Sequence, residues 1–245
     1  MDFSTKWASG TKERNLFTIG EPMTQRQFFY REYFKQIKDV ADKLPKTARI
    51  LEIGCGRGTI LQYLRSEGFE NITGMDNSDE ALALARENLG YGVKLIKGEA
   101  LDLPFTSQEF DLVISMGVSE HVDNYPKFFY EQLRVLKLGG WLVCMTVPRK
   151  FSAQILNIFG SDKYYRSRNS VAQYETFLNK MTDHHVISLW LNPYPLFTPI
   201  SPRLECAITK LYKKIHWLRG TIKSYPFHGS GLLCQSHFLI TRRSS

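Results

Sequence analysis

The sequence predicts an α/β fold in which helices cover both faces of a parallel β-sheet. Short apolar runs alternate with segments of helical periodicity between residues 48 and 148, as in successive β-α-β units. The runs ILEIG, FDLVIS and WLVCMTV are nearly continuous in apolar residues, which is typical of central strands covered on both faces. The glycine-rich stretch GCGRG follows the first run, and such turns join a strand to a helix beside a ligand site.

The first elements follow from periodicity. Apolar residues that recur near every 3.6 residues predict a helix at 23–43, which Pro45 ends. A short apolar strand is expected at 48–54. A helix is expected at 59–67, because its apolar residues fall on one side.

The next units repeat this order. A second strand is expected at 71–76, followed by a helix at 78–89. Ser78 is suited to the N-cap of that helix, since its hydroxyl can accept a backbone hydrogen bond and acidic residues follow in the first turn. The remaining expected strands are 93–97, 110–116, 140–147, 185–191 and 238–242, and the remaining expected helices are 126–136, 152–159 and 170–181.

Length and composition fit one globular domain over residues 1–245. We divide it into an N-terminal helical cap (1–47), a cofactor-binding core (48–148) and acceptor-binding elements with the last two strands (149–245). No run of apolar residues is long enough to span a membrane, and the N-terminus lacks the apolar segment of a secretory signal. The four cysteines show no C-x-x-C spacing, which favours reduced thiols in the cytoplasm and no metal site.

Three glycines and one carboxylate predict a nucleoside site. Gly54, Gly56 and Gly58 stand at alternate positions after the first strand and permit close approach of a ligand to the backbone. Asp76 ends the second strand, where a carboxylate can accept both hydroxyls of a ribose. Because ligands bind beyond the carboxyl ends of parallel strands, these residues predict an adenosine-containing ligand.

The same stretch argues against a dinucleotide. Its spacing is G-x-G-x-G rather than G-x-G-x-x-G, and Glu52 precedes it. A carboxylate there would repel a pyrophosphate but could pair with a cationic amino group. In addition, none of the twelve tyrosines has a lysine four residues later, as short-chain dehydrogenases require.

Five stretches, in order, resemble the motifs of class I S-adenosylmethionine-dependent methyltransferases: LEIGCGRG, GMDNS, GEALDLPF, FDLVISMGVSEHV and LRVLKLGGWLV. The resemblance covers about residues 48–148. It implies a Rossmann-like three-layer α/β/α sandwich with a seven-stranded, mostly parallel sheet whose last strand is antiparallel. It also implies S-adenosyl-L-methionine as cofactor and methyl transfer as the activity.

The resemblance further assigns binding roles. Glu52 would hold the ammonium group of the methionine moiety, together with the backbone of the glycine turn at Gly54, Cys55 and Gly56. Asp76 would accept the ribose hydroxyls. The other implied contacts are Asn77, Ser78, Glu99, Ala100 and Leu101 around the adenine, and Ser115, Met116 and Gly117 beside the sulfonium and its methyl group.

A Glu120-His121 pair follows the fourth expected strand and resembles the Glu-His step of quinone-biosynthetic O-methyltransferases. A histidine is suited to act as general base toward a hydroxyl acceptor, which makes these two residues the catalytic candidates. The alternative is that His121 contacts the cofactor or anchors its loop. A metal role is less favoured, and His184-His185 is interpreted as a polar entry to a strand.

Positive charge is concentrated in the C-terminal part. Residues 149–245 hold 14 Lys and Arg against 4 Asp and Glu, whereas residues 1–148 hold 18 against 20. Residues 203–219 have the pattern of a basic amphipathic helix, which would either pack on its own sheet or lie on an anionic membrane surface. Nucleic acid is a less favoured partner, because no separate RNA-binding module is recognisable.

These observations favour an enzyme that methylates a small or lipid-linked acceptor, with O-methylation ahead of N- or C-methylation. The alternatives are an RNA or protein methyltransferase and a non-catalytic adaptor with this fold. The expected location is cytoplasmic, with peripheral contact to a membrane. The sequence does not indicate an oligomeric state or the identity of the acceptor.

Overall fold

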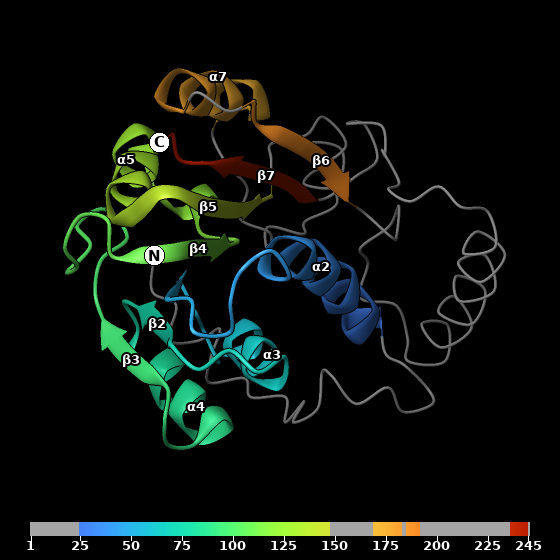
Figure 1. Ribbon diagram of the computed structural model, residues 1–245, viewed down its shortest axis with the longest axis vertical. Helices are drawn as coiled ribbons and strands as arrows, with labels where there is room; N and C mark the ends of the chain where they lie inside the picture. Colours follow the sequence, from blue (N-terminus) through green and yellow to red (C-terminus); the bar gives the residue numbers. More distant parts are fainter. Residues whose placement is uncertain (1–24, 148–168, 183–184, 192–235, 245) are drawn as a thin grey trace, which may run out of the picture.

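The computed structural model describes residues 25–147, 169–182, 185–191 and 236–244, which form an α/β/α sandwich (Figure 1). The strands of its sheet are β1 Ile50–Ile53, β2 Ile72–Asp76, β3 Lys94–Lys97, β4 Phe110–Met116, β5 Leu136–Thr146, β6 Ile187–Leu191 and β7 Ser236–Arg242. The helices are α2 Gln25–Ala41, α3 Thr59–Ser66, α4 Asp79–Leu89, α5 Tyr125–Val135 and α7 Val171–Met181, with a 3-10 turn at Ser119–His121.

The described strands form one seven-stranded sheet in the order β3-β2-β1-β4-β5-β7-β6. Strands β1 to β5 pair in parallel, and β7 runs antiparallel to both of its neighbours, β5 and β6. This confirms the predicted mostly parallel sheet with an antiparallel last strand. The chain reverses its direction across the sheet between β1 and β4, and ligands of such sheets bind at this switch point.

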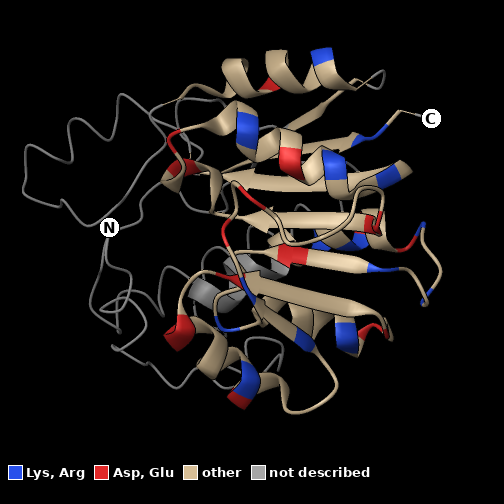
Figure 2. Ribbon diagram, turned by 90° about the vertical axis from the view of Figure 1, so that its left-hand side faces the viewer, with Lys and Arg blue, Asp and Glu red and all other residues tan. Residues whose placement is uncertain are grey.

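Two apolar layers enclose the sheet. Ile50 of β1 and Leu112 of β4 belong to the cluster that packs against α2, α3 and α4. Their neighbours Leu51 and Val113 point to the other face and pack with residues of α5 and α7. Alternate side chains of these strands therefore face two cores, which is why the runs are apolar almost throughout. Most charged residues lie on the helices and in the loops (Figure 2).

Strand β5 begins at Leu136, earlier than the expected 140–147. Its register against β4 shifts between Phe110 and Leu112, and Gly139 has a φ of 72°. This irregular start is held by β7, because Gly139 N–H donates to the carbonyl of Arg243 and Arg243 N–H donates to that of Gly140. Gly139 and Gly140 thus lie within the strand, as glycines at bulges do.

The predicted capping residue Ser78 is confirmed, and the structure adds a second cap at Ser170. The Ser78 hydroxyl accepts a hydrogen bond from Ala81 N at 3.2 Å, so α4 begins where the sequence indicated. Ser170 and Gln173 form a reciprocal capping box at the start of α7. The helices predicted at 152–159 and 203–219 lie outside the described residues.

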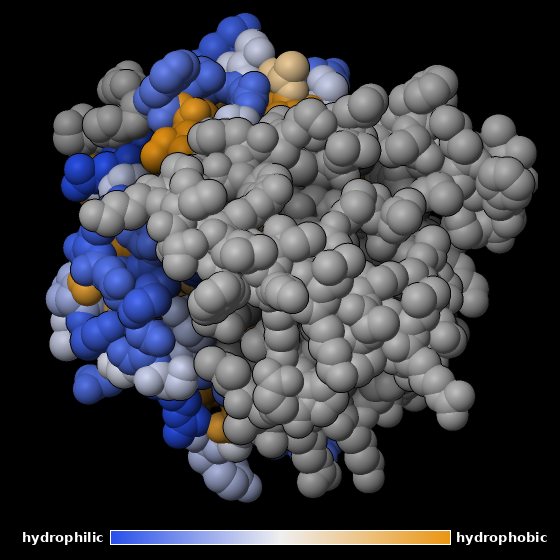
Figure 3. Space-filling view, turned by 90° about the vertical axis from the view of Figure 1, so that its right-hand side faces the viewer, coloured by the Kyte–Doolittle hydropathy of each residue, from blue (hydrophilic) through white to orange (hydrophobic). Residues whose placement is uncertain are grey.

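The surface seen from the right-hand side of Figure 1 is mostly hydrophilic where it is described, with small hydrophobic patches (Figure 3). None of the described helices combines the length and the apolar character that crossing a bilayer requires.

Candidate active site

A cavity of about 670 Å³ opens at the carboxyl ends of β1, β2 and β4. Its walls come from the glycine turn after β1, the ends of β2 and β4, the segment after β3 and the loop that leads to α5. The cavity thus lies at the topological switch point of the sheet. Its size is within the range of ligand pockets.

The glycine turn is fixed to strand β2. The backbone N–H groups of Gly54 and Cys55 both donate to the carbonyl of Met75, at 2.7 and 3.0 Å. Gly56 N–H donates to the carboxylate of Asp76 at 2.9 Å. The chain therefore crosses from β1 to α3 along the end of β2 and places the turn beside Asp76.

Internal packing explains two of the three glycines. Gly54 has a φ of 69°, and a Cβ there would stand 2.4 Å from Cγ2 of Val118. Gly58 has a φ of 78°, and its Cβ would stand 2.7 Å from Cδ1 of Leu89. The sequence pattern suggested only close approach by a ligand. The structure adds that left-handed backbone and neighbouring side chains require glycine at both positions.

Asp76 is buried at the end of β2, and both of its carboxylate oxygens accept backbone hydrogen bonds. Gly56 N–H donates to Oδ2, and Ser78 N–H donates to Oδ1 at 3.0 Å. Two oxygens offer about four acceptor positions, so the carboxylate can still accept the two hydroxyls of a ribose.

Glu52 is a buried carboxylate that lacks a cationic partner among the described residues. Its exposed fraction is 2%, and its Oε2 has no hydrogen-bond partner in the described part of the chain. Burial raises its pKa well above the usual value, and the nearby charge of Asp76 raises it further, while the backbone N–H of Leu61 opposes the rise. A buried carboxylate on a cavity wall fits a cationic ligand group such as an ammonium.

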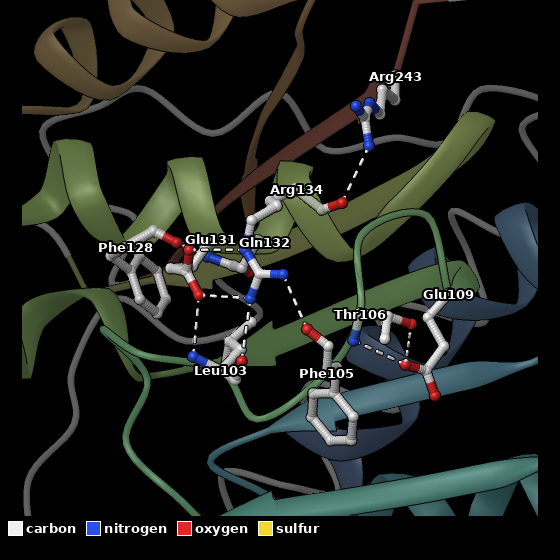
Figure 4. Close-up of polar contacts among 9 residues, drawn as sticks. All are labelled: Leu103, Phe105, Thr106, Glu109, Phe128, Glu131, Gln132, Arg134 and Arg243. Carbon is white, nitrogen blue, oxygen red and sulfur yellow. Dashed lines mark hydrogen bonds and ion pairs between the residues drawn. The ribbon is translucent and has the colours of Figure 1, made fainter.

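The segment after β3 carries Glu99, Ala100 and Leu101 into the cavity wall and is tied to α5 (Figure 4). Arg134 of α5 donates to the carbonyls of Leu103 and Phe105, at 2.9 and 2.8 Å. Glu131 accepts from Leu103 N–H at 2.9 Å and from the same guanidinium at 2.7 Å. The position of the predicted adenine-binding segment therefore depends on this partly buried ion pair.

The end of β4 separates residues that were predicted together. Met116 and Gly117 line the cavity, whereas Ser115 is fully buried and its hydroxyl donates to Oε1 of Gln132 at 2.8 Å. In the 3-10 turn that follows, His121 lines the cavity, whereas Glu120 is 5% exposed and its Oε1 would lie 3.4 Å from a Cβ placed on Gly117.

Most of the predicted residues thus meet at one cavity. Those that line it are Glu52, Gly54, Cys55, Gly56, Asp76, Asn77, Glu99, Ala100, Leu101, Met116, Gly117 and His121. Those that do not are Gly58, Ser78, Ser115 and Glu120. Gly58 and Ser78 instead shape the helix starts beside the cavity, as N-caps of α3 and α4.

Sequence reasoning missed several residues of the wall. Tyr33 reaches the cavity from α2, and its hydroxyl lies 2.6 Å from Oγ of Ser236, 203 residues away. No sequence signal joins these two residues. Arg57 also lines the cavity, and its place inside the glycine turn was a signal that could have identified it. Asp123 and Asn124 complete the wall near His121.

Comparison with known proteins agrees with this geometry. Residues 51–144 match a family described as "Methyltransferase domain". The chain is 33% identical over 134 residues to 2-methyl-6-phytyl-1,4-hydroquinone methyltransferase 2 of Oryza sativa subsp. japonica, a match that covers 51% of this chain and 38% of that protein. It is 30% identical over 138 residues to the ubiquinone biosynthesis O-methyltransferase of Hydrogenovibrio crunogenus, covering 54% of each. The chain thus spans about half the length, or less, of these curated relatives.

Among solved structures, a putative sarcosine dimethylglycine methyltransferase from Galdieria sulphuraria superposes with a TM-score of 0.60 at 18% identity, covering 89% of this chain and 87% of that one. A putative methyltransferase from Haloferax volcanii, solved in complex with the Trm112 activator, gives a TM-score of 0.62 at 17% identity, covering 89% and 93%. At sequence identities this low, the similarity to these structures shows the fold alone. The fold, the five motifs and the family match agree, and the chain contains, over residues 51–144, the methyltransferase domain of the class I S-adenosylmethionine-dependent methyltransferases.

Proposed function

We propose that this chain transfers a methyl group from S-adenosyl-L-methionine to a small or lipid-linked acceptor, most readily to an oxygen atom. The observation that carries the proposal is buried Glu52, whose Oε2 has no hydrogen-bond partner among the described residues and which shares a cavity wall with Asp76. A cationic ammonium and a ribose are the two groups that these carboxylates fit. S-adenosylmethionine contains both, and when bound it supplies an electrophilic methyl group on a sulfonium.

The residues around the cavity have the following proposed roles. Glu52 and the backbone of Gly54, Cys55 and Gly56 hold the methionine end. Asp76 holds the ribose. The adenine lies against Asn77, Glu99, Ala100 and Leu101, while Met116 and Gly117 form the β4 end near the methyl group. Ser78 and Ser115, which were predicted beside them, do not line the cavity, so their proposed roles are to support the chain behind it.

His121 is the proposed general base. It lines the cavity just beyond Gly117, and its imidazole suits removal of a hydroxyl proton near neutral pH. Glu120 is buried and its carboxylate lies close to Gly117, so we assign it a positioning role for this turn. Replacing His121 with Asn should lower kcat by roughly 100- to 10,000-fold and change the pH–rate profile. If only the KM for the cofactor rises, His121 binds the cofactor instead. His185→Asn, on the exposed entry to β6, is the control.

The acceptor class follows from the relatives. The names of two of them specify a hydroquinone with a phytyl chain and ubiquinone biosynthesis, and a third specifies phthiotriol and phenolphthiotriol dimycocerosates. These are small or lipid-linked acceptors. We infer that the elements outside residues 48–148, namely the N-terminal cap 1–47 and the segment 149–245, form the acceptor side of this single-domain chain.

The test combines binding with transfer. The full chain is titrated with S-adenosylmethionine by calorimetry and then incubated with methyl-labelled cofactor and four acceptors: a catechol with a prenyl chain, its tail-less analogue, a fatty acid and total RNA. We expect binding, with label in the organic extract of one of the first three. Absence of binding would contradict the assigned cofactor. Label in the RNA fraction would favour the RNA alternative, label in protein the protein alternative, and binding without transfer the adaptor.

We also propose a cytoplasmic enzyme that contacts anionic membrane through residues 203–219. The support is the sequence alone: Lys210, Lys213 and Lys214 lie on a segment with apolar residues at helical spacing. Flotation with anionic and neutral vesicles should separate the outcomes. Binding only to anionic vesicles, lost when the three lysines are replaced by Gln, is the expected result. Equal behaviour on both vesicle types would contradict it.

A further inference from the structure

Arg57 gives the cavity its one Lys or Arg side chain among the described residues that form the wall. Four carboxylates share this wall, those of Glu52, Asp76, Glu99 and Asp123. An anionic ligand group placed here would meet repulsion from these carboxylates unless it lay against Arg57.

The backbone of Arg57 has a fixed position. Its carbonyl accepts a hydrogen bond from Nδ2 of Asn88 in α4 at 3.0 Å. The next residue, Gly58, donates its N–H to the carbonyl of Cys55 at 2.8 Å, which closes the turn. Arg57 is half-buried and belongs to the cavity wall, at a turn that is held on both sides.

Helix α3 begins two residues later and adds to the positive potential at this point. Its N-cap, Gly58, has no side chain that could accept a hydrogen bond from the first turn. The N–H groups of a first helical turn and the associated end of the helix dipole favour anions. One of these groups, the N–H of Leu61, already donates to Glu52, so a second carboxylate at the start of α3 depends mainly on the Arg57 guanidinium for its charge partner.

The methionine end of the cofactor is a zwitterion whose ammonium and carboxylate are bonded to the same carbon atom. A site that holds the ammonium at Glu52 must accept the carboxylate close by, within the same turn of chain. We propose that Arg57, with the first turn of α3, binds this carboxylate, so that Glu52 and Arg57 together select the intact amino-acid end of the cofactor. This inference rests on the proposed function and assigns Arg57 a role in binding only.

Guanidinium suits the role better than ammonium would. Its planar donors can match both oxygens of a carboxylate, whereas a lysine offers a single charged point. The site should accordingly discriminate against decarboxylated S-adenosylmethionine, which keeps the ammonium, the ribose, the adenine and the sulfonium but lacks the carboxylate.

The experiment compares these two ligands by calorimetry on the full chain. We expect the native protein to bind S-adenosylmethionine roughly 10- to 100-fold more tightly than its decarboxylated analogue, as a charge-assisted hydrogen bond implies. Arg57→Gln should lower the affinity for S-adenosylmethionine by this factor, so that the variant binds both ligands with equal affinity. Arg57→Lys should recover part of the preference. Arg86→Gln, which removes an exposed charge from α4, should leave both affinities unchanged.

Two results would overturn the inference while leaving the proposed function intact. One is a native protein that binds both ligands equally. The other is an Arg57→Gln variant that weakens both ligands by the same factor, because Arg57 would then act on another part of the cofactor or on the shape of the turn. The native comparison decides the question even if the variant does not fold. Failure of the native protein to bind S-adenosylmethionine would instead contradict the proposed function itself.

Discussion

The backbone N–H of Gly56 donates a hydrogen bond to Oδ2 of Asp76 at 2.9 Å, across 20 residues of sequence. The glycine turn and the acidic end of β2 therefore form one unit of structure before any ligand binds. This relationship places Asp76 where it both shapes the turn and faces the cavity.

Replacing Asp76 should accordingly affect folding and binding together. Asp76→Ala leaves the N–H groups of Gly56 and Ser78 without their acceptor, so we expect a loss of roughly 1–3 kcal/mol in the free energy of unfolding and weaker cofactor binding. Asp76→Asn keeps one side-chain oxygen, so its loss in the free energy of unfolding should be smaller. Asp79→Ala, an exposed change on the adjacent helix, is the control. Urea denaturation and calorimetry would measure the two effects. Unchanged binding by Asp76→Ala would contradict the assigned site.

Glu52 should make stability and binding depend on pH in opposite directions. Its pKa is raised in the folded protein, so the folded state holds a proton that the unfolded state releases as pH rises above the usual value of 4.5. The free energy of unfolding should therefore fall as pH rises from that value toward the folded pKa. Glu52→Gln removes this pH dependence of stability. As pH increases, the melting temperature of the ligand-free variant should therefore rise relative to that of the native protein.

Binding should show the reverse trend, because an ammonium is best held by the ionised carboxylate of Glu52. Affinity for S-adenosylmethionine should increase with pH across the same range and release a proton, which calorimetry in buffers of different ionisation enthalpy can detect. Glu52→Gln should bind more weakly and without proton release. A native protein whose affinity does not vary with pH would argue against Glu52 as the ammonium partner.

Gly54→Ala should be destabilising through two separate effects. The backbone has a φ of 69°, and the new Cβ would overlap Cγ2 of Val118. Gly68 serves as the control, because its φ is 88° and the nearest atom to its Cβ position, Cδ of Lys46, is 4.0 Å away. We expect Gly68→Ala to cost about 1 kcal/mol for the positive φ alone and Gly54→Ala to cost more.

Adding Val118→Ala to Gly54→Ala tests the overlap directly. Removal of the Val118 methyl groups should recover the steric part of the loss, and the non-additivity of the two changes in chemical denaturation measures it. Strictly additive effects would show that the backbone conformation accounts for the whole cost.

The ion pair of Glu131 and Arg134 should stabilise the protein above acidic pH. The hydrogen bonds from Arg134 lower the pKa of Glu131 below its usual value of 4.5, so its contribution is present above that value and is lost as pH falls through the folded pKa. Glu131→Gln should lower the free energy of unfolding at neutral pH by roughly 1.5–3 kcal/mol. The difference in the free energy of unfolding between this variant and the native protein should become smaller at acidic pH. A constant difference at all pH values would contradict this cause.

Local patterns were sufficient to predict the elements around the cavity. The apolar runs predicted β1, β4 and most of β5 because strands buried on both faces admit few polar residues, and Ser78 marked the start of α4 because capping is a local interaction. Glu52 and Asp76 were identifiable because a carboxylate beside a glycine turn, or at the end of the next strand, has few structural uses. The sequence by itself thus determined the fold class and many of the residues that line the cavity.

Only the tertiary structure decided which residues that are adjacent in sequence have different surroundings in the fold. Ser115 and Met116 are adjacent, yet alternate strand residues face opposite sides, so one donates to Gln132 and the other lines the cavity. Tyr33 comes to the cavity because α2 packs against β7, where Ser236 meets its hydroxyl. Such contacts arise from packing between segments far apart in the chain, and a single sequence carries no local signal of them.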